Sequence, residues 1–153
     1  MIKLYTALVF LPLLGAVLAG LFGRILGDRG SQAVTLIGIT TSALLSVYVF
    51  FDVTGNNNPV VVDLFTWIES DSFEVSWALR VDQLTAVMLM VVCVVSAVVH
   101  WYSVGYMSHD KAIPRFMSYL SLFTFAMLML VTADNFLQMF FGWEGVGLCS
   151  YLL

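Results

Sequence analysis

The chain has 153 residues, of which 61% are hydrophobic and only 10% are charged, with a formal net charge of -4. So few charges could not cover the surface of a soluble domain, which indicates a protein with several membrane-spanning segments. The six basic residues form no stripe and no nucleic-acid-binding motif occurs, which argues against nucleic acid as a partner.

The first two apolar runs predict transmembrane helices over residues 4–26 and 33–51, joined by a short polar turn at 27–32. Each run is close to the roughly 20 apolar residues that a spanning helix needs. Pro12 lies inside the first run, where a membrane helix tolerates it. That run is too long for the apolar part of a signal peptide and has no clear cleavage site, so we expect it to be retained as a helix.

The next segment, residues 52–82, is the long polar stretch of the sequence and predicts a β-hairpin. Asn56, Asn57 and Asn58 form a turn signal, after which residues 60–68 are β-branched and aromatic. A second turn at 69–72 leads into a strict alternation that places one set of side chains on the apolar face: Phe73, Val75, Trp77, Leu79 and Val81. The opposite face carries Glu74, Ser76, Ala78, Arg80 and Asp82.

Three further helices are predicted, over about 83–104, 116–133 and from Asn135 to the end of the sequence. Pro114 suits the first turn of the second of these. We therefore expect an all-α integral membrane fold of about five transmembrane helices with an external β-hairpin, divided into residues 1–51, 52–82 and 83–153. The last helix ends on Tyr151-Leu152-Leu153 without a polar flank, and we expect the chain to be a fragment of a longer protein.

The charges predict an orientation in the membrane. The turn after the first helix holds Arg24 and Arg29, and the turn after the third holds Lys111 and Arg115. The hairpin segment carries a single Arg80 among its acids, which are Asp52, Asp63, Glu69, Asp71, Glu74 and Asp82. Because positive residues favour the cytoplasmic side, we expect the N-terminus and the 52–82 segment on the outer side.

Glu144 is the main candidate functional residue. It lies about 13 Å along the last helix from Asn135, near the midplane of a bilayer core about 30 Å thick. The helical period places it opposite a face of small residues, Gly142, Gly145 and Cys149, and beside Gly147. Burial and a nearby cation move the proton affinity of a carboxylate in opposite directions, so Glu144 suits proton transfer. The alternative is a neutral, hydrogen-bonded side chain that only ties helices together.

Three other ionisable residues are weaker candidates. His100 could relay protons, but we favour a ring whose polar head lies at the membrane interface. Asp134 fits a helix cap or turn, with proton entry as the alternative, and Arg115 fits a headgroup anchor. Cys93 and Cys149 fall in apolar runs and are expected to be buried, and neither histidine has partners at metal-ligand spacing, so no metal site is predicted.

The stretch A-D-N-F-L-Q-M-F-F-G-W-E-G-V-G-L-C-S-Y-L-L, residues 133–153, resembles the fifth-helix signature of the antiporter-like subunits of respiratory complex I. The stretches S-W-A-L-R-V-D-Q-L-T-A-V-M-L and H-W-Y-S-V-G-Y-M narrow the resemblance to the subunit L branch, NADH-quinone oxidoreductase, the counterpart of mitochondrial chain 5. The resemblance implies that Glu144 matches the family's fifth-helix glutamate, which is thought to pair with a lysine on a later helix in proton translocation.

The resemblance also sets expectations for location, partners and cofactors. It implies a multi-pass protein of an energy-transducing membrane, the bacterial inner membrane or its mitochondrial counterpart, in contact with lipid, protons and the other membrane subunits. NADH, FMN, iron–sulfur clusters and quinone are expected on other subunits, with no cofactor in this chain. The large subunit of a multisubunit sodium/proton antiporter and a purely structural membrane subunit remain as alternatives.

Overall fold

The computed structural model describes residues 2–56, 59–71 and 73–153. Five long helices and one hairpin follow in the order α1 (Ile2–Leu21), α2 (Gly23–Asn56), β1 (Val60–Ser70), β2 (Phe73–Val81), α3 (Gln83–Tyr106), α4 (Ile113–Val131) and α5 (Phe136–Leu152). Asn57, Asn58 and Ser72, which belong to the two predicted turns, lie outside the described residues.

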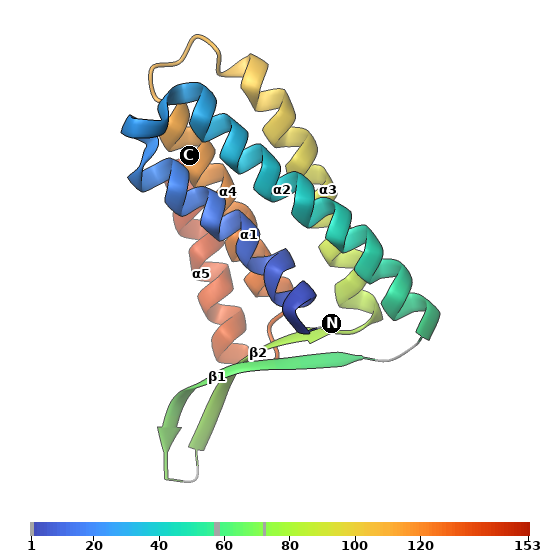
Figure 1. Cartoon of the computed structure of the whole chain (residues 1–153). Coiled ribbons are helices and arrows are strands. Elements are labelled where there is room, and N and C mark those ends of the chain that lie inside the picture. The colour runs from blue at the N-terminus through green and yellow to red at the C-terminus, as the bar shows by residue number, and fades with distance from the viewer. Residues whose placement is uncertain (1, 57–58, 72) are drawn as a thin grey trace.

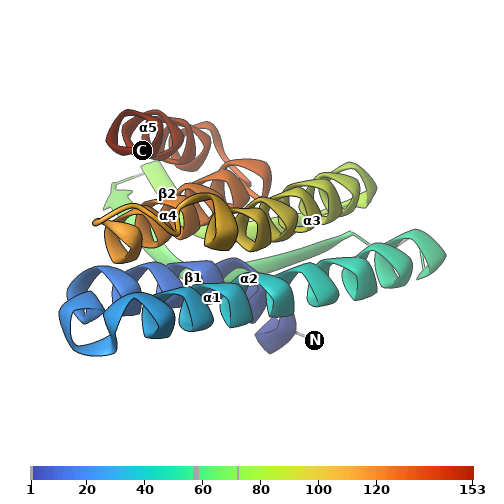
Figure 2. The same ribbon diagram turned by 90° about the horizontal axis from the view of Figure 1, so that it is seen from above.

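The helices form two layers. In Figure 2, α1 and α2 lie side by side in one layer, α3 and α4 in the other, and α5 packs on the outer side of α4. The hairpin extends across one end of the bundle, near the N-terminus, and the C-terminus lies at the other end (Figure 1). The predicted all-α membrane fold with a hairpin at one end of the bundle is thus confirmed.

Among the described residues, α1, α2, α3 and α4 are long and apolar enough to cross a membrane. The fifth helix, α5, has 17 residues, which is the lower limit of the length of a spanning helix. It lies alongside α4 and begins at the hairpin end, with Asn135 as its N-cap. The predicted antiparallel pair of helices is therefore present.

The junction of the first two helices differs from the prediction. The first helix ends at Leu21, not Leu26, and the second starts at Gly23, with a break at Gly27 where φ is +68°. A Cβ at Gly23 would lie 2.8 Å from the Cβ of Pro114, so only a glycine allows the chain to turn this closely against α4.

The end of the second helix and both ends of the fourth also differ from the prediction. The second helix runs past Phe51 to Asn56 because Val53 continues the buried stripe of Val49. The fourth helix starts at Ile113 and ends at Val131, before the predicted Ala133, because the carbonyl oxygen of Thr132 accepts a hydrogen bond from the backbone of β2.

Buried hydroxyl groups join the helices in the apolar interior. Pro12 has no N–H to bond the carbonyl oxygen of Leu8, and Ser42 Oγ on α2 donates to that oxygen instead, at 3.0 Å. Ser118 Oγ on α4 similarly donates to the carbonyl oxygen of Ala16 at 2.7 Å. Such bonds between helices contribute about 1 kcal/mol or less each in membrane proteins.

The hairpin packs one face on the end of the bundle. Its strands are antiparallel, with Val60 opposite Val81. The predicted apolar face is buried at four positions, which are Val75, Trp77, Leu79 and Val81. Ala78, predicted on the open face, is also fully buried, because the start of α5 covers the edge of β2 at this point.

Candidate functional site

The two predicted faces of α5 exist. On the face of small residues, a Cβ at Gly142 would lie 2.7 Å from the backbone of Leu130, and one at Gly145 would lie 3.1 Å from the Cβ of Ala126. Cys149 on the same face is 2% exposed. These small residues allow α5 to approach α4 closely, as small residues do in membrane helix pairs.

The opposite face of α5 carries Glu144 and is open. Glu144 is exposed, and a Cβ at Gly147 would meet no atom within 4 Å. The apolar side chains that share this face are also exposed, and they are Leu137, Phe140, Leu148 and Tyr151. The prediction of a buried carboxylate is therefore wrong for this stretch of chain by itself, because α4 and the hairpin contact other sides of α5.

The side chain of Glu144 forms no hydrogen bond or ion pair with any of the residues that the structure describes. Its chemistry therefore depends on whatever covers this face.

His100 lies in a different place from the one favoured by the sequence. It is fully buried between α3 and α4, so its placement at the membrane interface is wrong. Its Nδ1 is 2.8 Å from the carbonyl oxygen of Ser96 and 3.3 Å from Ser96 Oγ, and its Nε2 is 3.0 Å from Ser121 Oγ. Ser96 Oγ also lies 2.5 Å from Thr124 Oγ1.

The proton positions in this cluster follow from its acceptors. A carbonyl oxygen only accepts, so Nδ1 of His100 carries a proton, and in the neutral ring Nε2 accepts from Ser121 Oγ. Thr124 Oγ1 donates to the carbonyl oxygen of Leu120 at 3.0 Å, so it accepts the proton of Ser96 Oγ. A neutral His100 therefore satisfies every hydrogen-bonding group of the cluster, and the ring joins α3 to α4.

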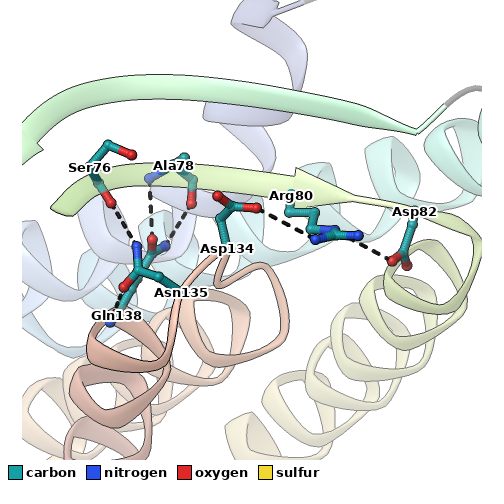
Figure 3. Close-up of polar contacts among 7 residues, drawn as sticks. All are labelled: Ser76, Ala78, Arg80, Asp82, Asp134, Asn135 and Gln138. Atoms are coloured by element: carbon teal, nitrogen blue, oxygen red, sulfur yellow. Dashed lines mark hydrogen bonds and ion pairs between the residues drawn. The ribbon is translucent and has the colours of Figure 1, made fainter. Parts of the chain in front are cut away.

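Asp134 lies in the turn between α4 and α5, as predicted, and the helix cap is its neighbour Asn135. Asn135 Oδ1 accepts from the backbone N–H of Gln138 at 2.9 Å, and its Nδ2 donates to the carbonyl oxygen of Ser76 at 2.8 Å. Asp134 Oδ1 is 3.8 Å from a guanidinium nitrogen of Arg80, whose Nε is 3.8 Å from Asp82 Oδ2 (Figure 3). Asp134 thus helps to hold the hairpin.

Gln138 was not singled out by the sequence, yet it fixes α5 to the hairpin. Its side chain is fully buried, donating to the carbonyl oxygen of Ala78 at 2.8 Å and accepting from the Ala78 N–H at 3.2 Å (Figure 3). Phe141, one turn later, stacks edge-on to Trp77 with 4.9 Å between ring centroids. A polar residue in the first turn of an apolar helix was the available signal.

Arg115 lies exposed in the first turn of α4, at the end of the bundle opposite the hairpin. The four candidate residues are therefore not brought together. His100 lies in the α3–α4 interface, Asp134 at the hairpin and Glu144 on the open face of α5. Within the described ranges, no group of three or more His, Cys, Asp or Glu side chains could hold a metal ion.

Comparison with known proteins identifies the relatives of the chain. Residues 67–117 match the family described as NADH-ubiquinone oxidoreductase (complex I), chain 5 N-terminus. The chain is 51% identical over 150 residues to NADH-ubiquinone oxidoreductase chain 5 of Hypocrea jecorina, and 53% identical over 150 residues to that of Arabidopsis thaliana. In both cases the match covers 98% of this chain and 22% of the relative.

Two further matches extend the comparison. A Neurospora crassa protein with the name probable intron-encoded endonuclease 4 is 50% identical over 150 residues, covering 98% of this chain and 28% of that protein. Among solved structures, a chain of the archaeal membrane-bound sulfane sulfur reductase, a respiratory membrane complex, has the same fold, with a TM-score of 0.73 and 19% identity. This match covers 95% of the present chain and 22% of that chain.

The chain thus spans about a fifth of the length of the chain 5 relatives that it matches. The match in sequence runs through all of its helices and the hairpin. With its helical bundle and the small-residue face of α5, the chain belongs to the chain 5 family of NADH-ubiquinone oxidoreductase (complex I).

Proposed function

We propose that this chain is part of a proton-translocating membrane subunit of NADH-quinone oxidoreductase. The observation that carries the proposal is the position of Glu144. It lies on an apolar face of α5 that the rest of the described chain leaves open, while the opposite face is packed on α4.

The open face suits a carboxylate whose partner comes from elsewhere in the subunit. The relatives are four to five times longer than this chain, so most of their length lies beyond the matched region. A cation brought next to Glu144 favours its ionised form, and removal of that cation favours proton uptake. A lysine on a later helix, as the family resemblance implies, supplies this cation, and energy from quinone reduction would change its charge state.

In this proposal the N-terminus and the hairpin lie on the outer side of the membrane. The charges support it, since Arg24, Arg29, Lys111 and Arg115 lie at one end of the bundle and the acidic hairpin lies at the other. The membrane is the bacterial inner membrane or its mitochondrial counterpart, and the partners are lipid, protons and the other membrane subunits. NADH, FMN, iron–sulfur clusters and quinone bind to other subunits of the complex.

Two alternatives have less support. The sodium/proton antiporter reading is not favoured because the relatives with high identity are named as complex I chain 5. The endonuclease name of one relative does not suit this stretch, which is 61% hydrophobic and has ten acidic residues against six basic ones, whereas DNA binding requires a basic surface.

The experiment uses the full-length subunit in its assembled complex, in inverted membrane vesicles. NADH oxidation and NADH-driven proton uptake are recorded together for Glu144→Gln. Glu74→Gln, which removes an exposed carboxylate from the hairpin, is the matched control. We expect Glu144→Gln to assemble, as it leaves the packed face of α5 unchanged, and to lose most of its proton uptake.

The control should pump normally. Normal proton uptake in an assembled Glu144→Gln complex would contradict the proposal and leave a structural role for this carboxylate. Failure of Glu144→Gln to assemble would also count against it, because the carboxylate would then be needed for packing.

A further inference from the structure

A cleft opens at the end of the bundle opposite the hairpin. It lies where α1 passes into α2 and where α4 begins, and its volume is about 750 Å³. Gly20, Gly23 and Ser118 are among the residues that line it. Small residues bring α1 and α4 close together at this point, since even a Cβ at Gly20 would lie 2.7 Å from Ser118 Oγ.

The cleft is basic. Arg24, Lys111 and Arg115 line it together with one carboxylate, that of Asp28. All four side chains are exposed, and among the described residues none of the three cations lies within ion-pair distance of a carboxylate. Three positive charges from two turns of the chain therefore converge on one cleft without being neutralised by Asp28.

The backbone adds a further attraction for an anion. Ala112 occupies the cap position of α4 and makes no side-chain hydrogen bond to the helix, while its own N–H donates to Asp110 Oδ1 at 2.6 Å, so the N–H groups of the first turn of α4 have no side-chain cap. Ala112 and Pro114 both line the cleft. Ser31 Oγ, which does not line the cleft, lies 3.6 Å from the position of a Cβ at Gly23; it is fully buried and has no hydrogen-bond partner in the described part of the chain.

Apolar side chains flank the basic groups. Leu21, which lines the cleft, is 76% exposed, and Ile25 in the following turn is 84% exposed. A basic cleft at the end of a transmembrane bundle, with apolar side chains beside it, matches an amphipathic anion better than a freely soluble one. Basic pockets between membrane helices are typical sites for phospholipid headgroups.

We propose that this cleft binds the phosphate of an anionic phospholipid headgroup, held by Arg24, Lys111 and Arg115 with its acyl chains beside Leu21 and Ile25. Lipid binding at this end fixes the α1–α2 junction to the start of α4. The site is independent of Glu144, which lies on α5, and of the direction in which protons move.

The test uses the full complex, purified in detergent, depleted of lipid and titrated with a photoreactive phosphatidylglycerol. We expect cross-links in peptides 19–28 and 111–119, and few with photoreactive phosphatidylcholine. In the variant R24Q/K111Q/R115Q, half-maximal cross-linking should need roughly a hundredfold more lipid, since each cation near a membrane surface contributes about fivefold. R29Q is the matched control, because Arg29 belongs to the same turn but does not line the cleft.

R24K/R115K keeps the charges and should retain the cross-links, which separates loss of binding from failure to fold. Equal cross-linking of the triple variant and R29Q would overturn the proposal. Displacement of phosphatidylglycerol by millimolar inorganic phosphate would also overturn it, because the site would then recognise free phosphate and not a lipid.

Discussion

The α3–α4 interface and the outer face of α5 each hold an ionisable side chain, but the two side chains differ in burial and in hydrogen bonding. His100 is fully buried and hydrogen-bonded through both ring nitrogens to groups of this same chain. Glu144 is exposed on a helix that packs on one side only. A buried group with complete partners stabilises a fold, whereas an exposed group on an apolar face can meet a partner from another part of a larger protein, which is why the proposed function places proton coupling at Glu144 and not at His100.

The largest effect is expected from adding a side chain to the face of α5 that packs on α4. Gly142→Leu places a side chain where even a Cβ would lie 2.7 Å from the backbone of Leu130, so α5 must move away from α4. Overpacking of this kind costs about 3 kcal/mol or more when the backbone must shift. We expect the subunit to be lost from the assembled complex, measured by its abundance in purified membranes.

The matched substitution is Gly147→Leu, on the open face of the same helix, where a Cβ meets no atom of the described chain within 4 Å. Normal abundance of this variant would show that the Glu144 face of α5 keeps space beside Gly147 in the full-length subunit. Equal loss of both variants would contradict the difference between the two faces, since the Gly147 side would then be packed as tightly as the Gly142 side.

A smaller effect is expected in the buried hydrogen-bonded cluster around His100. His100→Leu keeps a similar side-chain volume but leaves Ser121 Oγ and the carbonyl oxygen of Ser96 without the ring. Hydrogen bonds between membrane helices contribute roughly 1–2 kcal/mol at most, so the unfolding temperature of the purified complex should fall by a few degrees. His109→Leu, in the exposed turn before α4, is the control and should leave it unchanged.

Proton uptake distinguishes the two roles of His100. If the ring only joins helices, His100→Asn in an assembled complex should pump at the normal rate, as in the control. Loss of pumping with assembly intact would contradict the difference in role between His100 and Glu144. His100 would then act in proton transfer, the role that the sequence left open.

The sequence predicted those features that depend on a local period. Alternation along residues 73–81 located the strand, and the helical period placed Glu144 opposite Gly142 and Gly145. Features that depend on distant partners were missed. The burial of His100 needs Ser121, which is 21 residues away, and the burial of Ala78 needs Gln138, which is 60 residues away. No periodicity within one helix or strand reports such a partner.

The smallest expected effect concerns Asp82, the N-cap of α3. Its side chain is half-exposed, between the buried His100 and the exposed Glu144. Its Oδ1 accepts from the backbone N–H of Thr85 at 2.8 Å, and this bond holds the pKa of the carboxyl below its usual 3.8, although partial burial opposes the shift. A lowered pKa in the folded state means that the cap stabilises the helix above the usual pKa and loses this effect as the pH falls through the folded value.

We therefore expect the start of α3 to lose protection from hydrogen exchange below about pH 4 in the purified complex, after correction for the intrinsic dependence of exchange on pH. Asp82→Ala should remove about 1 kcal/mol of protection at neutral pH and abolish the change below pH 4. Asp63→Ala, at an exposed carboxylate of β1, is the control. An unchanged pH profile in Asp82→Ala would assign the transition to another group, and the ionisable residue with the clearest structural role at the hairpin end would then be Asp134, through its ion pair with Arg80.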